Sequence, residues 1–302
     1  MRLRPTPRCC GFSVPELMVA LALGLLLVGA VFMSYAATLA GSRHQRALGE
    51  MGEGATLALS LLRRDLLQAG YIHPDALDGD RFMPADPVIL QRAVFGCDRA
   101  FVAASANVGQ GQCNPVGAVG DAIEINFEAA RDTALQTADG RLADCVGNAL
   151  KMPSGQDQPG AATERTRIPA AHRYFVLPAV ANGPPVALAC ASARSGAERL
   201  VPHVEALHIR YGVSAGWQAD DPSTRRPQRY VAAKDFRPID WPSVVAVRLC
   251  VLMRSAGSVL PANEAQTSAY RDCEGQQQNS NDGVLRRAFV TTVGLRNREA
   301  AQ

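Results

Sequence analysis

The most pronounced pattern in the chain is a long uncharged stretch near its N-terminus. No residue from Leu17 to Ser42 carries a charge, and most of these twenty-six positions are apolar. About twenty consecutive apolar residues are enough to cross a bilayer as an α-helix. Three arginines precede the stretch and a single one, Arg43, follows it directly, so the larger basic cluster predicts an N-terminus on the cytoplasmic side.

An ordinary secretory signal is the alternative interpretation of this stretch. Small residues between Ser34 and Ala37 offer such a signal a cleavage site. A signal peptide has a shorter apolar core than the one present here, so we favour a helix that stays attached to the chain.

The helix is expected to continue beyond the apolar stretch with one polar and one apolar side. The apolar positions recur at steps of three and four residues, which is the spacing of an amphipathic helix: Leu48, Met51, Ala55, Leu59, Leu62 and Leu66. Charged residues from Arg43 to Asp65 mostly fill the other sides. Gly70 is the expected C-terminal stop. Four glycines weaken the middle of this helix: Gly41, Gly49, Gly52 and Gly54.

After Gly70 the pattern changes to short apolar or alternating runs separated by Gly, Pro, Asn and Asp, which predicts β-strands. The predicted strands are 88–95, 122–128, 173–177, 186–190, 204–211, 244–253 and 289–295. The run at 244–253 is the most continuously apolar, so we expect it at the centre of a sheet. Long polar connections lie at 105–120, 151–168, 213–230 and 262–283, where we expect disulfide anchoring or partner contacts.

Composition and charge narrow the class of protein. Hydrophobic residues make up 47% of the 302 positions and charged residues 20%, which is enough for a sizeable core. The net charge of +3 comes from the three arginines before residue 12, because the other 28 basic residues equal the 28 acidic ones. This balance argues against a strongly basic nucleic-acid-binding surface, although a local basic patch stays open.

The eight cysteines fall into two groups. Cys9 and Cys10 precede the apolar stretch, and the other six are widely spaced without any CxxC pair: Cys97, Cys113, Cys145, Cys190, Cys250 and Cys273. That spacing argues against a zinc or thioredoxin-like site and favours disulfides in an oxidising compartment, with free buried thiols as the alternative. Six cysteines allow fifteen connectivities, so the pairing stays open.

Glu16 is the one charged residue at the start of the apolar helix. A carboxylate there is costly unless it is paired or reaches an interface. It belongs to a short motif that resembles the processing site of type IV prepilins, in which a glycine and a phenylalanine are followed by a glutamate that opens a long apolar helix after a basic leader. The matching residues are Gly11, Phe12, Ser13, Val14, Pro15, Glu16, Leu17, Met18 and Val19. Pro15 replaces the commoner aliphatic residue but lies in the first turn, where proline is tolerated.

The resemblance implies a role for three of these residues. Gly11 would be the last leader residue, after which prepilin peptidase cuts on the cytoplasmic side. Phe12 would become the N-terminus of the mature chain and be methylated on its amine. Glu16 would pair with the Phe12 amine of a neighbouring subunit during assembly.

The resemblance extends into the C-terminal half. The segments LVPHVEALHIRYGV at 200–213, WPSVVAVRLCVLMRS at 241–255 and RRAFVTTVGLRNR at 286–298 resemble the PilW-type minor pilins and, less closely, the J-type minor pseudopilins of type II secretion. RRDLLQAGY at 63–71 adds to this likeness. The cysteine-rich loops match no pattern of either family.

The residues that could serve catalysis or metal binding do not have the spacing of known motifs. Five histidines form no HExxH pair and no triad spacing, and we expect them to be exposed or at sheet edges: His44, His73, His172, His203 and His208. His203 and His208 would face opposite sides of one strand. Asp75, Asp78 and Asp80 lack the spacing of a calcium loop and are expected in a solvated turn. Trp217, Trp241, Tyr211 and Tyr230 are expected to pack at strands rather than form a binding patch.

The expected architecture is therefore an α+β chain with a leader at 1–11, a transmembrane or filament-core helix at 12–42, an amphipathic half at 43–70 and a β-rich periplasmic head at 71–302. The resemblance implies a non-catalytic minor pilin, without cofactor or metal, that primes pilus assembly at or near the tip. Its expected partners are prepilin peptidase, other minor pilins, the major pilin, a tip adhesin as a further candidate, and the inner membrane. The chain would leave the inner membrane for the cell-surface pilus on assembly. The alternatives are a type II secretion pseudopilin, a membrane-anchored periplasmic enzyme and a DNA-uptake binding module.

Overall fold

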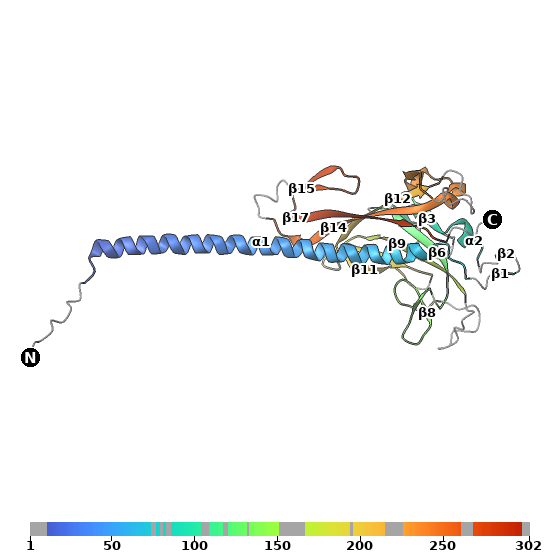
Figure 1. The fold of residues 1–302 in the computed structure, drawn as a ribbon, viewed down its shortest axis with the longest axis horizontal. Helices are drawn as coiled ribbons and strands as arrows, with labels where there is room; N and C mark the ends of the chain where they lie inside the picture. The colour runs from blue at the N-terminus through green and yellow to red at the C-terminus, as the bar shows by residue number, and fades with distance from the viewer. Residues whose placement is uncertain are drawn as a thin grey trace, which may run out of the picture. The chain divides into compact units, whose positions relative to one another are not determined.

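The computed structural model describes residues 11–73, 77–78, 81–82, 86–103, 109–116, 120–131, 133–150, 167–193, 196–214, 226–260 and 268–297. Two compact units meet between Ala47 and Leu48, and helix α1 (Val14–Gln68) contributes residues to both. The second unit holds the described strands, all paired antiparallel (Figure 1). The structure therefore confirms the α+β class with a long N-terminal helix and a β-rich head.

The other described helices are short: α2 (Val88–Gln91), η3 (Ala233–Asp235) and η4 (Pro238–Ser243). The strands are β1 (Leu77–Asp78), β2 (Arg81–Phe82), β3 (Val94–Cys97), β4 (Ala100–Phe101), β5 (Cys113–Asn114), β6 (Ala122–Ala129), β7 (Leu135–Gln136), β8 (Leu142–Ala143), β9 (Ile168–Leu177), β10 (Ala187–Ala191), β11 (Glu198–Pro202), β12 (Val204–Val213), β13 (Arg229–Val231), β14 (Val244–Ser258), β15 (Ser268–Arg271), β16 (Gln277–Ser280) and β17 (Val284–Gly294).

The second half of α1 forms part of the core of the head. Its predicted apolar stripe is confirmed, because Met51, Ala55, Leu62 and Leu66 are all buried. Asp65, which we expected on a polar side of the helix, is instead buried with an exposed fraction of 2%. The stripe is therefore wider than the sequence pattern indicates, and it includes a carboxylate that needs partners inside the head.

Glycine is required at the end of this helix, and a second glycine lies close to a flexible side chain of the head. Gly70 has a φ of +72°, and a Cβ there would lie 2.8 Å from the Asn297 carbonyl oxygen, so the predicted helix stop is confirmed. A Cβ at Gly54 would lie 2.8 Å from Met253 Cε. Gly49 and Gly52 face open space, and α1 continues through them without a break.

The first large sheet has five strands in the order β11-β10-β9-β6-β3. Residues 122–128 alternate in polarity, which is typical of a strand with one solvated face. Every residue of β6 is nevertheless buried, including Glu124. Arg173 on the neighbouring strand β9 donates to Glu124 Oε2 at 2.8 Å and to the Ala103 carbonyl at 2.8 Å. The polar face of β6 is thus covered, and the charge of Glu124 is paired with that of Arg173.

The second large sheet has four strands in the order β13-β12-β14-β17. Strand β14 lies between β12 and β17, so its predicted central place is confirmed; Figure 1 shows β14 and β17 running side by side. Asp121, just before β6, links the two sheets. Its amide donates to the Leu207 carbonyl at 2.6 Å, and its carboxylate accepts from the Ile209 amide at 2.6 Å.

Several strand predictions need correction. Residues 88–95 are not one strand, because α2 occupies 88–91 before β3 begins. The Asp86 carboxylate accepts from the Val88 amide at 2.9 Å, which favours a helical turn there. Strand β9 begins earlier than predicted, as does β17, and the polar segment 262–283 contains the hairpin of β15 and β16. Strand β11 was also missed.

All six distal cysteines are paired in three disulfides, as Cys97–Cys113, Cys145–Cys190 and Cys250–Cys273. The expectation of disulfides is therefore confirmed. Two of the bridges anchor the predicted long loops that contain Cys113 and Cys273. No cysteine lies in the connections 151–168 and 213–230, which are mostly outside the described residues. Cys9 and Cys10 also lie outside them.

Candidate processing and assembly site

The segment from Gly11 to Glu16 forms the start of α1. Gly11, Phe12 and Ser13 precede the helix, which begins at Val14. The Ser13 carbonyl accepts the Leu17 amide at 3.1 Å and so closes the first helical turn. Glu16 Oε2 lies 3.5 Å from the Ser13 amide, the backward contact that is typical of a capping box. Pro15 is tolerated there because the first amides of a helix need no helical acceptor.

The two residues of the predicted cleavage site are open to solvent. Phe12 has an exposed fraction of 86%, and a Cβ built on Gly11 would have no atom within 4 Å. The fold of this chain therefore places no steric demand for glycine at position 11. A requirement for glycine there would have to come from an enzyme that binds the segment.

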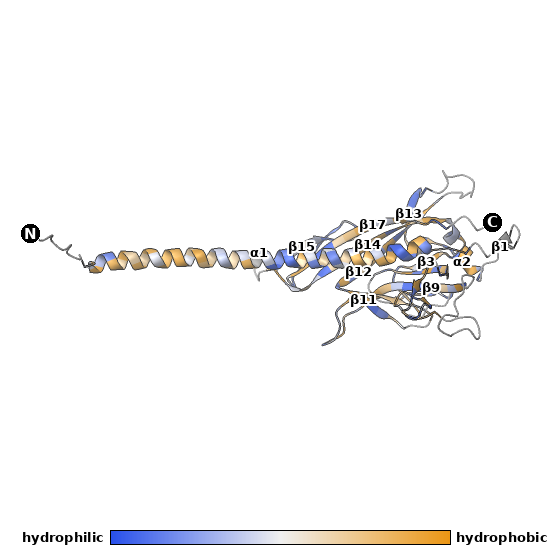
Figure 2. Cartoon of the chain, turned by 60° about the horizontal axis from the view of Figure 1, so that its bottom comes forward, coloured by the Kyte–Doolittle hydropathy of each residue, from blue (hydrophilic) through white to orange (hydrophobic). Residues whose placement is uncertain are grey.

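The apolar surface that follows is exposed, and no described residue of the first unit covers it. Large hydrophobic side chains from Leu17 to Tyr35 are exposed, in contrast to the buried apolar residues from Met51 onward. Figure 2 shows this N-terminal part of α1 as mostly hydrophobic and the later part as mixed. By length and composition, α1 is the one helix among the described residues that could cross a membrane. So large an apolar surface needs a bilayer or other helices to cover it.

Inside the head, α1 is held to β9 by a buried cluster of polar side chains. Asp65 Oδ2 accepts from Tyr174 at 2.5 Å and lies 2.7 Å from His172 Nδ1. Arg64 Nε donates to the other oxygen of Asp65 at 3.1 Å. His172 has an exposed fraction of 3% and packs edge-on against the Phe127 ring. Asp65, His172 and Tyr174 are closed to solvent and Arg64 is half-buried at their edge, so the cluster joins α1 to β9 inside the head.

The electrostatics of the cluster agree with a structural role. Burial raises the pKa of Asp65, but the charge and hydrogen bond of His172, with Arg64, outweigh burial and hold that pKa below its usual value. Burial and the nearby Asp65 charge raise the pKa of Tyr174 well above its usual value. Asp65 therefore stays ionised while Tyr174 stays a neutral donor.

Two predictions about histidines are wrong. His172 is neither exposed nor at an edge, because β9 lies between β10 and β6 in the five-stranded sheet. His203 and His208 do not share a strand, since His203 lies in the turn between β11 and β12 with a φ of 64° and His208 lies in β12. The sequence signal that was missed is the pair of adjacent charged or polar residues His172 and Arg173 within an apolar strand.

The aromatic residues behave largely as expected. Tyr211 and Trp241 are buried and pack edge-to-face with ring centroids 5.0 Å apart, and Phe236 stacks on Trp241. Tyr230 is exposed, and Trp217 lies outside the described residues.

The structure offers little to a metal ion. Asp75 and Asp80 lie outside the described residues, and Asp78 lies in the two-residue strand β1. Within the part of the chain that the structure describes, no group of three or more His, Cys, Asp or Glu side chains is placed to hold a metal ion.

Comparison with known proteins gives a similar solved structure and a match to a family. The structure is similar to a type IV-like pilin from Thermus thermophilus with 16% identity and a TM-score of 0.32, over 82% of this chain and 96% of that one. No curated protein matches the sequence. Residues 174–297 match the model of the family described as PilW, type IV pilus-assembly protein W. The predicted resemblance to the PilW family is thus confirmed for this C-terminal part of the chain.

Proposed function

We propose that this chain is a minor pilin, a non-catalytic subunit that takes part in priming type IV pilus assembly and sits at or near the pilus tip. The observation that carries the proposal is the accessible segment from Gly11 to Glu16 at the start of an exposed apolar helix, on a chain whose residues 174–297 match the PilW family. The family match supports a pilus over a type II secretion system.

The segment from Gly11 to Glu16 determines how we propose that the chain is processed and where it is located. Prepilin peptidase removes the residues up to Gly11, and the new N-terminal amine of Phe12 is methylated. The apolar helix holds the chain in the inner membrane, with its head in the periplasm, until assembly. An oxidising periplasm is compatible with the three disulfides.

Glu16 is the proposed assembly residue. A carboxylate moved from water into a helical assembly needs a positive partner, because burying it unpaired is costly. The Phe12 amine of a neighbouring subunit supplies that charge in this proposal. Other minor pilins and the major pilin are the proposed neighbours.

The test is complementation of a deletion strain. Deletion should remove surface pili and leave type II secretion intact, and the wild-type gene should restore piliation. Glu16→Ala should insert in the membrane and be cleaved, yet fail to restore pili. Glu53→Ala is the control. It changes a solvent-exposed carboxylate in the part of α1 that belongs to the head, and it should restore pili. Loss of secretion with normal piliation would instead identify a pseudopilin.

A further inference from the structure

The two large sheets have four edge strands, and three of them are protected. Unpaired edges are templates for another strand, and proteins usually guard them by short length, charge, proline or bulges. Strands β3 and β13 have only four and three residues. Strand β11 carries Glu198, Arg199 and Pro202, and its pairing with β10 contains a register shift.

The fourth edge strand, β17, has none of these protections in its second half. It has eleven residues and pairs with β14 on one side only. The stretch from Ala288 to Gly294 contains no charge and no proline, and its register with β14 is unbroken. Its β-branched and aromatic residues favour extended backbone. Among the described residues, no strand pairs with its other edge.

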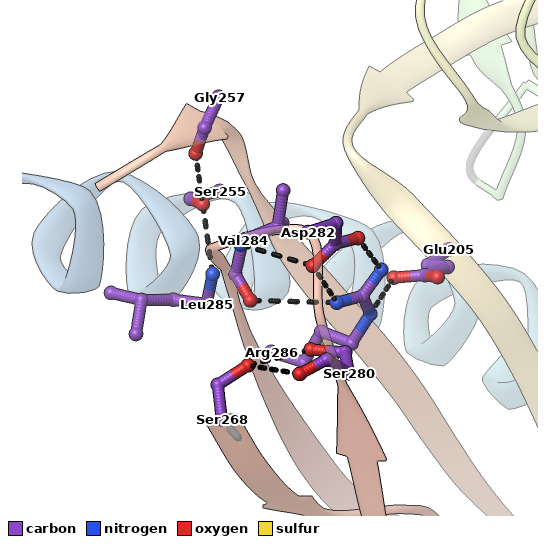
Figure 3. A network of polar contacts seen from close by, with 9 residues as sticks. All are labelled: Glu205, Ser255, Gly257, Ser268, Ser280, Asp282, Val284, Leu285 and Arg286. Atoms are coloured by element: carbon purple, nitrogen blue, oxygen red, sulfur yellow. Dashed lines mark hydrogen bonds and ion pairs between the residues drawn. The ribbon is translucent and has the colours of Figure 1, made fainter. Parts of the chain in front are cut away.

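The first half of β17 contrasts with the second because it is anchored by polar side chains (Figure 3). Arg286 donates to Glu205 at 2.8 Å and to Asp282 at 2.7 Å. The Leu285 amide donates to Ser255 Oγ at 3.1 Å. This network fixes the start of β17 to the rest of the head. The uncharged second half, in which exposed residues alternate with half-buried or buried ones, continues from this anchored start.

Exposed side chains mark the open half. Val290 has an exposed fraction of 49%, and Thr292 and Gly294 are exposed as well. Val290 lies opposite Cys250 of β14, whose disulfide to Cys273 holds the turn between β15 and β16. Val290 remains accessible to solvent although the disulfide holds the β15–β16 turn close to its neighbour Cys250.

We infer that the Ala288–Gly294 edge of β17 is where an extended segment of a different pilus subunit adds to the four-stranded sheet. This inference rests on the proposed function, which places the chain among other subunits. Strand addition satisfies the open backbone groups and lets alternate side chains set specificity.

Charge defines the partner segment. Exposed arginines, Arg287 and Arg296, stand just outside the uncharged stretch. A partner strand with an uncharged centre and acidic residues at its ends fits this pattern. A second copy of β17 fits it poorly, because antiparallel pairing over the stretch sets Arg286 of one copy opposite Arg296 of the other at both ends, with Arg287 directly beside them. Like charges directly opposite are destabilising.

Photo-crosslinking in cells tests the inference on the full chain. A benzophenone amino acid at position 290 should form an adduct with another pilus subunit, and mass spectrometry should map the link to an uncharged, extended segment of it. The same amino acid at Leu135, an exposed strand residue in the β7–β8 hairpin, is the control and should not give that adduct. An adduct between two copies of this chain, a link to a helix, or no adduct would overturn the inference.

A second variant tests the consequence for assembly. Thr292→Glu should lower piliation at least tenfold, because it puts a charge into the uncharged edge. The chain should still accumulate and unfold at the wild-type temperature, because Arg248 lies directly opposite position 292 and is of opposite charge. Leu135→Glu should restore pili normally. If Thr292→Glu restores wild-type piliation in a deletion strain that lacks pili, the strand-addition inference fails and the proposed pilus function stands. If the deletion strain keeps its pili, the proposed function itself fails.

Discussion

At the scale of single residues, Gly11 and Glu16 are accessible to an enzyme or a neighbouring subunit. Gly11 precedes the helix, and an added side chain would meet no other atom of the chain. Glu16 belongs to the first turn and contacts only the start of its own helix in the described structure. Both residues are therefore free to serve a partner rather than the fold.

The first prediction concerns Gly11→Val. The variant should fold and insert like the wild type, because the fold leaves room for valine, but the leader should stay attached since the peptidase must accommodate position 11. N-terminal sequencing of the wild-type protein should begin at methylated Phe12. A mature N-terminus near Ala37 would identify an ordinary signal peptide instead.

The second prediction at this scale concerns Asp121, which joins β6 to β12. Burial raises the pKa of Asp121 to about 7, with the Asp98 charge adding to burial, although the hydrogen bond from Ile209 opposes it. Arg210 and Glu274 are the other charged groups that act on it. The folded state thus binds the proton more tightly than the unfolded state, so this contribution to stability is complete below about pH 4 and is lost as the pH rises to about 7.

Asp121→Asn keeps an oxygen for the Ile209 amide but cannot ionise. Urea unfolding at pH 8 should show the variant roughly 1–3 kcal/mol more stable than the wild type, and the difference should shrink at pH 4. Asp235→Asn, at an exposed position of η3, is the control for the change from a carboxylate to an amide. Equal pH profiles for the Asp121 variant and the wild type would show that Asp121 ionises freely.

At the scale of elements, the spacing of apolar residues predicted the positions of helices and strands better than the polar residues did. The stripe on α1 and the central place of β14 followed from spacing and apolar run length. The helix α2 was missed because Val88–Gln91 is apolar enough for a strand while the Asp86 contact favours a turn. The hairpin at 268–280 was missed because its strands are polar and lie over a sheet rather than in the core.

Buried polar side chains were the features that the sequence predicted least well. Asp65 and Glu124 look like solvent-facing residues in their local patterns, and only the approach of β9 gives them the partners His172 and Arg173. Such pairs depend on contacts more than forty residues apart, which local periodicity does not contain. The Gly11–Glu16 segment, by contrast, is local and was recognisable from its motif.

The third prediction tests how α1 is held in the head. Asp65→Ala should destabilise the chain by about 3–5 kcal/mol, because it leaves Arg64, His172 and Tyr174 without their shared acceptor in a buried place. Thermal unfolding of the detergent-solubilised full chain measures the effect. Glu53→Ala, on an exposed part of the same helix, should change stability by less than about 0.5 kcal/mol. Similar unfolding temperatures for the two variants would refute the role of the cluster.

At the scale of the whole molecule, two features of the head bear on the proposed position of the chain in the filament. The exposed edge of β17 favours a defined neighbour, and an uncharged open strand on a subunit repeated in many copies would be an aggregation hazard. Residues 71–302 also make a large head for a subunit that is packed closely along a thin shaft. Both features favour a few copies at one end of the pilus.

The last prediction is therefore that the native protein is substoichiometric and located at or near the tip. Glu16 adds a constraint, because a buried carboxylate needs a positive partner and the outermost subunit can lack the neighbour that supplies one. A tip-complex member below the outermost position satisfies both conditions. Immunogold labelling of native pili should mark one end, and quantitative mass spectrometry should find far fewer copies of this chain than of the major pilin. Labelling along the whole shaft at a near-equal ratio to the major pilin would overturn the tip assignment while leaving membership of the pilus intact.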